Sequence, residues 1–263
     1  MLESMKLVKN HISKVPFRFW FLTNLYVFVM DPEDIQTILN SPNCFDRGLI
    51  YEFGDFFAKN GIGINKIHRW KQSRKTLNPV FSTKACQGYL KIFNEEISVM
   101  VSRMKDICKN HEPGYETSTV TSLFCILAMA MFPEHQERIF EEIKTTLPNL
   151  QDYVEYEDLN KCEFLDRFIK ETLRLFPSLP LIVRSVEKAT QIGQYTVPAG
   201  TQLIIPLIFL HREKSFWGPT AEEFDPDRFL PENIEKVNPH AYLPFAGGPK
   251  ICIGIKYANT CEN

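Results

Sequence analysis

The amino-acid sequence predicts a mainly α-helical fold with a small β-sheet subdomain. Stretches between residues 68 and 176 combine helix-forming composition with an apolar residue at every third or fourth position. Two shorter stretches, 17–30 and 181–209, are rich in β-branched and aromatic residues and contain turn-forming residues. The chain has 263 residues, of which 44% are hydrophobic, so it can bury a sizeable core.

The N-terminal region is predicted to begin with two strands within Phe17–Met30, joined by a polar turn at Thr23-Asn24. Asp31 and Pro32 then start a short helix that continues through Leu39. An aspartate can accept hydrogen bonds from the first backbone N–H groups of a helix, and proline is suited to its first turn.

Residues 68–109 are helical by composition, with an interruption at Asn78-Pro79, because proline cannot continue a helix. Thr119–Phe132 is apolar but too short to cross a bilayer, and it is predicted to be a buried core helix. Pro133–Leu147 is predicted to form the next helix. An apolar stripe continues along the second part of 68–109 and consists of Ile92, Ile97, Val101 and Met104.

The last helix before the second β-rich stretch is predicted over Asp158–Phe176 and is amphipathic. Its apolar face consists of Leu165, Ile169, Leu173 and Phe176. Strand-like alternation returns between Leu181 and Phe209, where Pro198-Ala-Gly200 predicts a hairpin turn.

Composition excludes several classes of protein. The net charge of −2 gives no basic surface of the kind that binds nucleic acid. The seven cysteines contain no C-x-x-C pair, which favours a reduced, cytosol-facing chain over a disulfide framework. We expect neither a signal peptide nor an N-terminal membrane anchor, because Arg18, Thr23 and Asn24 interrupt the apolar stretch Val15–Met30 and a span needs about 20 apolar residues.

One loop near the C-terminus has the chemistry of a metal-thiolate site. Phe245-Ala-Gly-Gly-Pro-Lys-Ile-Cys-Ile-Gly254 fits the pattern F-x-x-G-x-(R/K)-x-C-x-G and places Cys252 among glycines. Glycines allow the backbone to approach closely, so that N–H groups can point at the sulfur of an iron-bound thiolate. The alternative is a buried free cysteine that acts as a small hydrophobic residue, which is the commoner role of a lone cysteine.

Three further motifs precede or flank this loop. Trp70 and Arg74 form W-x-x-x-R and share one helix face, from which both can bind one carboxylate. Glu171 and Arg174 form E-x-x-R, and Arg228 lies in the P-x-R-F segment 226–229. On residue spacing alone, the E-x-x-R pair is a solvated helix salt bridge, because Arg174 falls roughly opposite the apolar stripe.

Together these motifs resemble the cytochrome P-450 family of haem-thiolate monooxygenases, and most closely its insect and microsomal fatty-acid-hydroxylase-type members. The resemblance covers about residues 25–257 and implies a truncated version of that fold. It implies haem b as cofactor, a hydrophobic small-molecule substrate such as a lipid, hormone or xenobiotic, dioxygen, and electrons from an NADPH-dependent reductase, with cytochrome b5 as a further candidate donor. It also implies the cytosolic face of the endoplasmic reticulum membrane.

The resemblance assigns a role to each motif residue. Cys252 would be the iron ligand, within the loop bounded by Phe245 and Gly254. Propionate-binding residues would be Trp70, Arg74, Arg184 and Lys250. Lys250 stands where the family usually has arginine and would act as a point charge without a bidentate fork. Glu171, Arg174 and Arg228 would form a buried structural triad. The basic residues His68, Arg69, Lys71 and Lys75 would face the reductase, although a charge run is more often a solvated helix face.

Glu116 and Thr117 would be the acid–alcohol pair that supplies protons for oxygen activation. The alternative for this dipeptide is ordinary helix capping. Pro113 replaces the residue that the family shows before its glycine, so no covalent haem–glutamate link is expected.

Relative to the family, the helices that should roof the substrate pocket are missing near residues 110–114, and the C-terminal strands are absent. We therefore expect residues 1–263 to form a single partial haem-thiolate domain. Two other functions stay open at this point. One is a thiolate-haem isomerase or dehydratase, which does not activate dioxygen. The other is a non-catalytic haem-binding or non-functional splice fragment.

Overall fold

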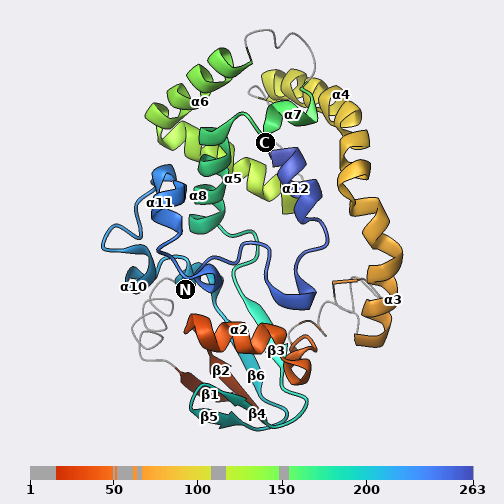
Figure 1. Ribbon diagram of the computed structural model, residues 1–263, viewed down its shortest axis with the longest axis vertical. Helices are drawn as coiled ribbons and strands as arrows, with labels where there is room; N and C mark the ends of the chain where they lie inside the picture. The colour runs from red at the N-terminus through yellow and green to blue at the C-terminus, as the bar shows by residue number, and fades with distance from the viewer. Residues whose placement is uncertain are drawn as a thin grey trace. The chain divides into compact units, whose positions relative to one another are not determined.

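The computed structural model describes residues 16–49, 51, 62–63, 67–107, 117–147 and 154–262. The chain forms two compact units (Figure 1). The sheet unit comprises Met1–Leu77, Leu179–Glu223 and Glu235–Cys252, and the helical unit comprises Asn78–Ser178, Phe224–Ile234 and Ile253–Asn263. Helices dominate and the sheets are small, which confirms the predicted fold class.

A mixed four-stranded sheet lies at the centre of the sheet unit. Its strand order is β1 (Phe17–Phe21), β2 (Asn24–Phe28), β6 (Gln202–Ile205) and β3 (Ile182–Ser185). The β2–β6 pair is parallel and the other two pairs are antiparallel. The predicted N-terminal strand pair is confirmed, but its turn is Leu22-Thr23, because Asn24 already pairs with Phe21.

A separate two-stranded sheet contains β4 (Thr190–Ile192) and β5 (Tyr195–Val197). Its turn is Gly193-Gln194, and Gly193 adopts the left-handed φ of 51° that glycine accommodates without strain. The hairpin predicted at Pro198-Ala-Gly200 is wrong, because β5 and β6 belong to different sheets.

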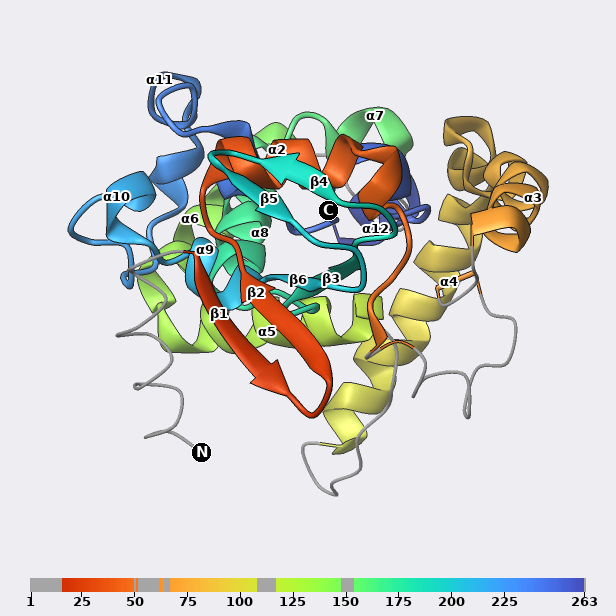
Figure 2. The same ribbon diagram turned by 90° about the horizontal axis from the view of Figure 1, so that it is seen from below.

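Helix α2 (Pro32–Asn40) lies on one face of the four-stranded sheet (Figures 1 and 2). As predicted, Asp31 caps it by accepting hydrogen bonds from the N–H groups of Glu33 and Asp34. Ile35 and Ile38 are fully buried in the core beneath it. The remaining helices of the unit are η1 (Pro42–Cys44), α3 (Ile67–Leu77), α9 (Leu207–Leu210), α10 (Lys214–Trp217), η5 (Pro239–Ala241) and η6 (Gly248–Lys250).

The helical unit is built around α8, which packs against α5, α6 and η4. Its elements are η3 (Asn78–Phe81), α4 (Thr83–Ile107), α5 (Thr117–Met131), α6 (Pro133–Thr146), α7 (Tyr156–Leu159), α8 (Glu163–Leu175), η4 (Pro226–Phe229), α11 (Pro231–Ile234) and α12 (Ile255–Glu262). The predicted interruption at Asn78-Pro79 is confirmed, since η3 separates α3 from α4. The helix predicted over Asp158–Phe176 is two helices, α7 and α8, separated at residues 160–162.

Helix α5 is not the buried core helix that its composition predicts. Its face with Thr121, Cys125 and Ala128 is buried. The opposite face is open: Leu123, Leu127 and Met131 are 53%, 48% and 55% exposed. On α4, Ile92 and Ile97 of the predicted stripe are also exposed, and the side chains of Val101 and Met104 lie outside the described part of the chain. Among the described residues, no helix is long and apolar enough to cross a membrane.

The start of α8 is held by a side chain from α6. Both carboxylate oxygens of Glu142 accept hydrogen bonds, one from the Phe164 N–H at 2.6 Å and one from the Leu165 N–H at 2.9 Å. These N–H groups have no acceptor within their own helix, so the carboxylate both caps them and complements the helix dipole. The anchored end fixes the position of α8 within its unit.

Candidate functional site

The cysteine loop is held by its own backbone. The Cys252 N–H donates to the Phe245 carbonyl at 2.9 Å, and the Ile251 N–H donates to the Gly248 carbonyl at 3.0 Å. Gly248 has a left-handed φ of 67°, and a Cβ at this position would lie 2.3 Å from the Leu39 carbonyl oxygen. The glycine that the motif requires therefore permits a close approach between the loop and α2.

Cys252 is exposed, whereas the other cysteines that the structure describes, Cys44, Cys86, Cys125 and Cys162, are buried free thiols. Burial raises the pKa of the Cys44, Cys86 and Cys162 thiols, which disfavours the thiolate form that a metal requires. The alternative of a buried hydrophobic cysteine therefore does not describe Cys252. Its sulfur can be reached by a ligand, and it interacts electrostatically with Arg47 and Arg74.

Lys250 is a buried cation whose ammonium group contacts aromatic rings instead of an acceptor among the described residues. It is 6% exposed, and its Nζ has no hydrogen-bond acceptor among the described residues. Aromatic rings form its surroundings, with Nζ 4.7 Å from the ring centre of Phe45 and 5.5 Å from that of Trp70. Burial, and then the positive charge of Arg184 and Arg47, lowers the pKa of Lys250 to about 8.

Two arginines lie in the same region of the sheet unit. Arg184 on β3 is 4% exposed, and burial lowers its pKa to about 10. Arg47 pairs with Arg184 in an isolated β-bridge, and its Nε is buried without an acceptor among the described residues. Sequence reasoning missed Arg47. The sequence offered only an arginine directly before Gly48. In the structure a Cβ at Gly48 would clash with Val183, so this segment passes close to β3.

Trp70 and Arg74 lie on one face of α3, as predicted. Trp70 is 7% exposed, and the guanidinium of Arg74 lies 5.9 Å from its ring centre. Arg74 Nη1 donates to the carbonyl of Ile251 at 2.7 Å, so this arginine holds the residue that precedes Cys252. Its contact with the loop was not predicted from the sequence.

These residues fit the anionic edge of a haem. None of the cations Arg47, Arg184 and Lys250 forms an ion pair with a described carboxylate. Buried charges are normally paired, because an unpaired charge in a low dielectric is costly. A ligand that brings its own carboxylates beside an exposed cysteine would supply the missing partners.

The E-x-x-R motif lies in the helical unit, and its charges are buried. Glu171 and Arg174 are both fully buried and form a bidentate pair, with Nε to Oε2 at 2.6 Å and Nη2 to Oε1 at 2.8 Å. The Asp225 N–H donates to Glu171 at 2.8 Å, and Arg228 Nε lies 3.7 Å from the same carboxylate. The structure thus brings the predicted triad together. The solvated salt bridge suggested by spacing is wrong, because both side chains are fully buried in the helical unit, where η4 packs on α8.

The predicted acid–alcohol pair is described only in part. Glu116 lies outside the described residues, and Thr117 is the first residue of α5, with a side chain outside them as well. Gly254 precedes α12, and its carbonyl accepts the Ala258 N–H at 2.7 Å. Gly254 and the E-x-x-R triad belong to the helical unit, whereas the other predicted cofactor residues belong to the sheet unit.

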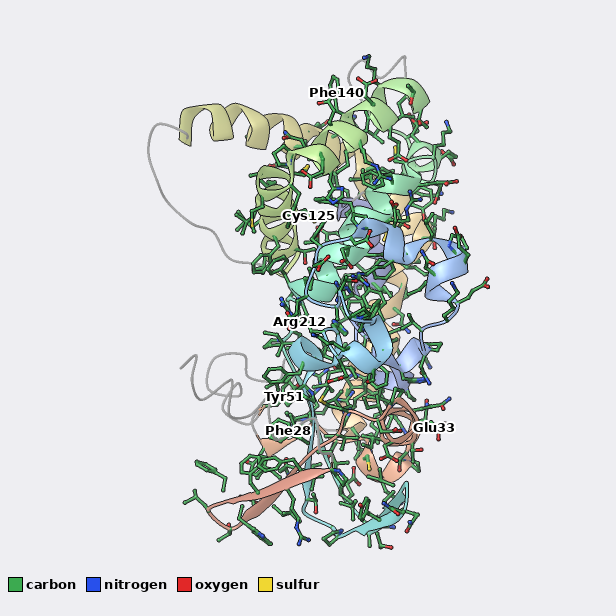
Figure 3. All side chains as sticks on the ribbon, turned by 90° about the vertical axis from the view of Figure 1, so that its left-hand side faces the viewer. Phe28, Glu33, Tyr51, Cys125, Phe140 and Arg212 are labelled. Atoms are coloured by element: carbon green, nitrogen blue, oxygen red, sulfur yellow. The ribbon has the colours of Figure 1, made fainter. Side chains whose placement is uncertain are left out.

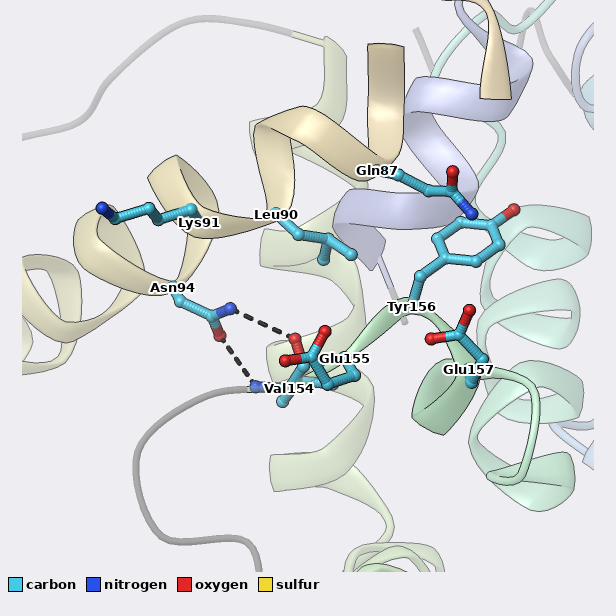
Figure 4. Close-up of a pocket in the computed structure, with 8 residues that line it drawn as sticks. All are labelled: Gln87, Leu90, Lys91, Asn94, Val154, Glu155, Tyr156 and Glu157. Carbon is cyan, nitrogen blue, oxygen red and sulfur yellow. Dashed lines mark hydrogen bonds between the residues drawn. The ribbon is translucent and has the colours of Figure 1, made fainter. Parts of the chain in front are cut away.

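A pocket of about 550 Å³ lies in the helical unit between α4 and α7 (Figure 4). Its wall is fixed by Asn94, whose side-chain amide donates to the Val154 carbonyl and accepts from the Val154 N–H, both at 3.2 Å. Glu155 and Glu157 line the side formed by α7. No cysteine and none of the predicted site residues line this pocket, so it is distinct from the thiolate loop.

Comparison with known proteins gives a consistent result. The family model described as "Cytochrome P450" matches residues 4–113 and 113–260. "Probable cytochrome P450 313a4" of Drosophila melanogaster is 26% identical over 370 residues, which cover 89% of this chain and 75% of that protein. "Probable cytochrome P450 313a1" of the same organism is 41% identical over 147 residues, covering 55% and 30%. "Cytochrome P450 3A19" of Capra hircus aegagrus is 39% identical over 145 residues, covering 55% and 66%.

The alignment with the first of these relatives spans 370 residues, more than the 263 of this chain, so that relative carries residues that have no counterpart here. The two matched pieces of the family model meet at residue 113. The chain spans only about a third of the second relative. Because the two pieces together extend over nearly all of the sequence, the chain belongs to the cytochrome P450 family, which implies haem as its cofactor.

Proposed function

We propose that the sheet unit holds haem b, with Cys252 as the thiolate ligand of the iron. Lys250 and Arg184 would bind the haem propionates, together with the indole N–H of Trp70. Arg74 would also bind a propionate, while its Nη1 holds the loop through the Ile251 carbonyl and adds positive charge beside the thiolate. Arg47, which lies beside Arg184, would be a further propionate partner.

The observation that carries this proposal is the buried Nζ of Lys250, which has no hydrogen-bond acceptor among the described residues and lies in the loop of an exposed cysteine. A structural role would not require an ammonium group without an acceptor, since burying it costs free energy. A propionate would satisfy it. The thiolate would in turn be stabilised by nearby positive charge and by the constrained backbone of its loop.

When bound, haem supplies the binding and activation of dioxygen for monooxygenation, and the protein supplies the ligand, the charges and a dry pocket. The substrate would be a hydrophobic small molecule. Glu116 and Thr117 would hold and pass protons on the substrate side. An NADPH-dependent reductase or cytochrome b5 would deliver electrons, and the exposed basic residues of α3 would be its docking surface. The location would be the cytosolic face of the endoplasmic reticulum membrane.

For this chain we propose a single partial domain in which the roof of the substrate pocket is missing near residues 110–114. Two findings support this. The alignment with "Probable cytochrome P450 313a4" is longer than this chain, and the two matched pieces of the family model meet at residue 113. The open face of α5 carries three large apolar side chains, Leu123, Leu127 and Met131. A pocket open to water would favour release of peroxide over oxidation of substrate, because the oxidising step needs a dry cavity.

The test has two readouts. The purified chain, reconstituted with haem and reduced under carbon monoxide, should give the strongly red-shifted Soret band of a thiolate complex, and Cys252→Ser should remove it. Reductase-supported oxidation of a lipophilic probe should then yield peroxide with little product. Retention of the band in Cys252→Ser would contradict the ligand assignment. Coupled turnover at the rate of a full-length relative would contradict the missing roof and exclude the non-catalytic alternative.

A further inference from the structure

Strand β1 is the outermost strand of the four-stranded sheet. It pairs with β2 on one side, and no strand among the described residues pairs with its other side (Figure 2). The strand contains no proline, and its register with β2 runs residue by residue without a bulge. Proline and β-bulges are devices that normally prevent an edge strand from pairing with another chain. The regular edge of β1 can therefore accept a further strand.

The backbone groups that face this edge belong to Arg18 and Trp20. The hairpin turn has two residues, so the pair Phe21–Asn24 that closes it exchanges hydrogen bonds. Bonded and non-bonded pairs alternate along antiparallel strands, so Phe19 also directs its N–H and C=O groups toward β2. The N–H and C=O groups of Arg18 and Trp20 consequently point away from β2, toward the free edge.

The side chains of β1 divide between the two faces of the sheet. An aromatic ladder with neighbouring ring centres 5.2–6.4 Å apart is formed by Phe17, Phe19, Phe21, Tyr26 and Phe28. The ladder lies on the sheet face away from α2, which Figure 3 shows through the opposite placement of Phe28 and Glu33. Because side chains alternate along a strand, Arg18 and Trp20 lie on the other face. Both are exposed, Trp20 to 68%, so a second chain can reach them.

We propose that β1 pairs with β1 of a second copy of this chain, antiparallel and about a two-fold axis at Phe19. The strand sequence Phe-Arg-Phe-Trp-Phe reads as nearly the same pattern in both directions from Phe19. In this register Arg18 of one copy lies opposite Trp20 of the other, and their outward N–H and C=O groups can exchange hydrogen bonds. The two-fold axis repeats this contact, as in any interface between two identical surfaces.

The side chains favour this register and this partner. The Cα atoms of a bonded antiparallel pair lie about 5.5 Å apart, which brings the Arg18 guanidinium within reach of the Trp20 ring for a cation–π contact. A register that placed Arg18 opposite Arg18 would oppose like charges. Phe19 meets Phe19 at the axis, so the aromatic ladders of the two copies become continuous. A second copy thus complements the charge and the rings of β1, and the pairing is independent of the haem site.

Sedimentation velocity of the haem-reconstituted chain, without lipid or detergent, tests the pairing. The chain should change from monomer to dimer between about 1 and 100 μM, the range in which small specific interfaces dissociate. Trp20→Lys should weaken the dimer at least about tenfold, because it puts a lysine opposite Arg18 at two symmetry-related positions. Addition of Arg18→Glu to Trp20→Lys should restore the dimer, since it puts a glutamate opposite that lysine. A chain that stays monomeric, or a double variant that dimerises as weakly as Trp20→Lys alone, would overturn the proposal.

Two controls separate this contact from folding and from other surfaces. Because Arg18 and Trp20 are exposed, the dilute variants should melt at the same temperature as the unmodified chain. Leu123→Lys, at an exposed apolar position on α5, should dimerise as the unmodified chain does. Hydrogen exchange should become slower at the Arg18 and Trp20 amides as the dimer forms, and should stay unchanged at the Phe19 amide. Loss of the dimer in Leu123→Lys, or slower exchange only at residues outside β1, would refute β1 as the contact.

Discussion

Replacement of Arg174 by methionine tests the buried charge triad most directly. The change Arg174→Met removes the guanidinium but keeps most of the apolar stem at a fully buried position. Among the described residues, Glu171 would keep the Asp225 N–H at 2.8 Å and Arg228 at 3.7 Å as partners for its buried carboxylate. Removal of one partner from a buried ion pair costs about 3–5 kcal/mol of unfolding free energy.

The matched control is Lys170→Met, four residues before Arg174 on the same helix. Lys170 pairs with Asp166 at the surface, where the two side chains are 45% and 40% exposed. Loss of an exposed i, i+4 pair costs about 0.5 kcal/mol or less. Urea unfolding measures the loss of unfolding free energy in each variant, and the two losses can be compared directly when the m-values are equal. Equal and small losses for Arg174→Met and Lys170→Met would refute the buried-triad reasoning.

The loss of unfolding free energy in Arg174→Met should depend on pH. Burial raises the pKa of Glu171, while Arg174, the Asp225 N–H and Arg228 oppose the rise. Without Arg174 the folded-state pKa rises further above the unfolded value, so the folded state takes up a proton first as pH falls. The stability deficit of Arg174→Met should therefore shrink between about pH 7 and pH 5. A deficit that does not change over this range would show that Glu171 is not the stranded charge.

Three further predictions concern the cysteine loop. Lys250→Met should speed haem loss from the reconstituted chain, measured by transfer to apomyoglobin, whereas Lys250→Arg should restore retention; equal retention in both would exclude a propionate contact. Gly248→Ala should lower the melting temperature by several degrees because its Cβ would lie 2.3 Å from a carbonyl oxygen. Gly200→Ala, which has a φ of 86° but no atom within 4 Å, is the control and should cost only about 1 kcal/mol, so an equal loss at both positions would remove the close-approach argument. Cys44→Ser should leave the carbon monoxide band of the haem-loaded chain unchanged. Loss of the band in this variant would contradict Cys252 as the ligand.

Local chemistry determined much of the secondary structure in advance. The Asp31 cap, the start of α2 at Pro32 and the interruption at Asn78-Pro79 depend on hydrogen bonds and steric limits within four residues, so they can be read from the sequence. The same holds for the cysteine loop. Its glycines indicate where the backbone lies close to another segment, and Gly248 lies close to α2.

Burial could not be obtained in this way, because it depends on which distant segments pack together. Spacing places Arg174 opposite the apolar stripe of its helix, yet η4 packs on α8 and Arg174 is fully buried. Composition makes α5 a core helix, yet Leu123 and Leu127 stay exposed, since no described element covers that face. The turn at 198–200 has hairpin chemistry, but the two strands beside it pair elsewhere.

The three cations Arg47, Arg184 and Lys250 show the same difference between what local sequence indicates and what long-range packing decides. Residue type and spacing within one short loop are enough to identify Cys252 and Lys250 as motif residues. Only the tertiary structure brought Arg47 against Arg184 through a bridge between segments far apart in the chain, and only it left the Lys250 ammonium without an acceptor among the described residues. The physical reason is that a motif specifies which groups are present, whereas a charge becomes functional through desolvation and through the partners that long-range packing supplies or withholds.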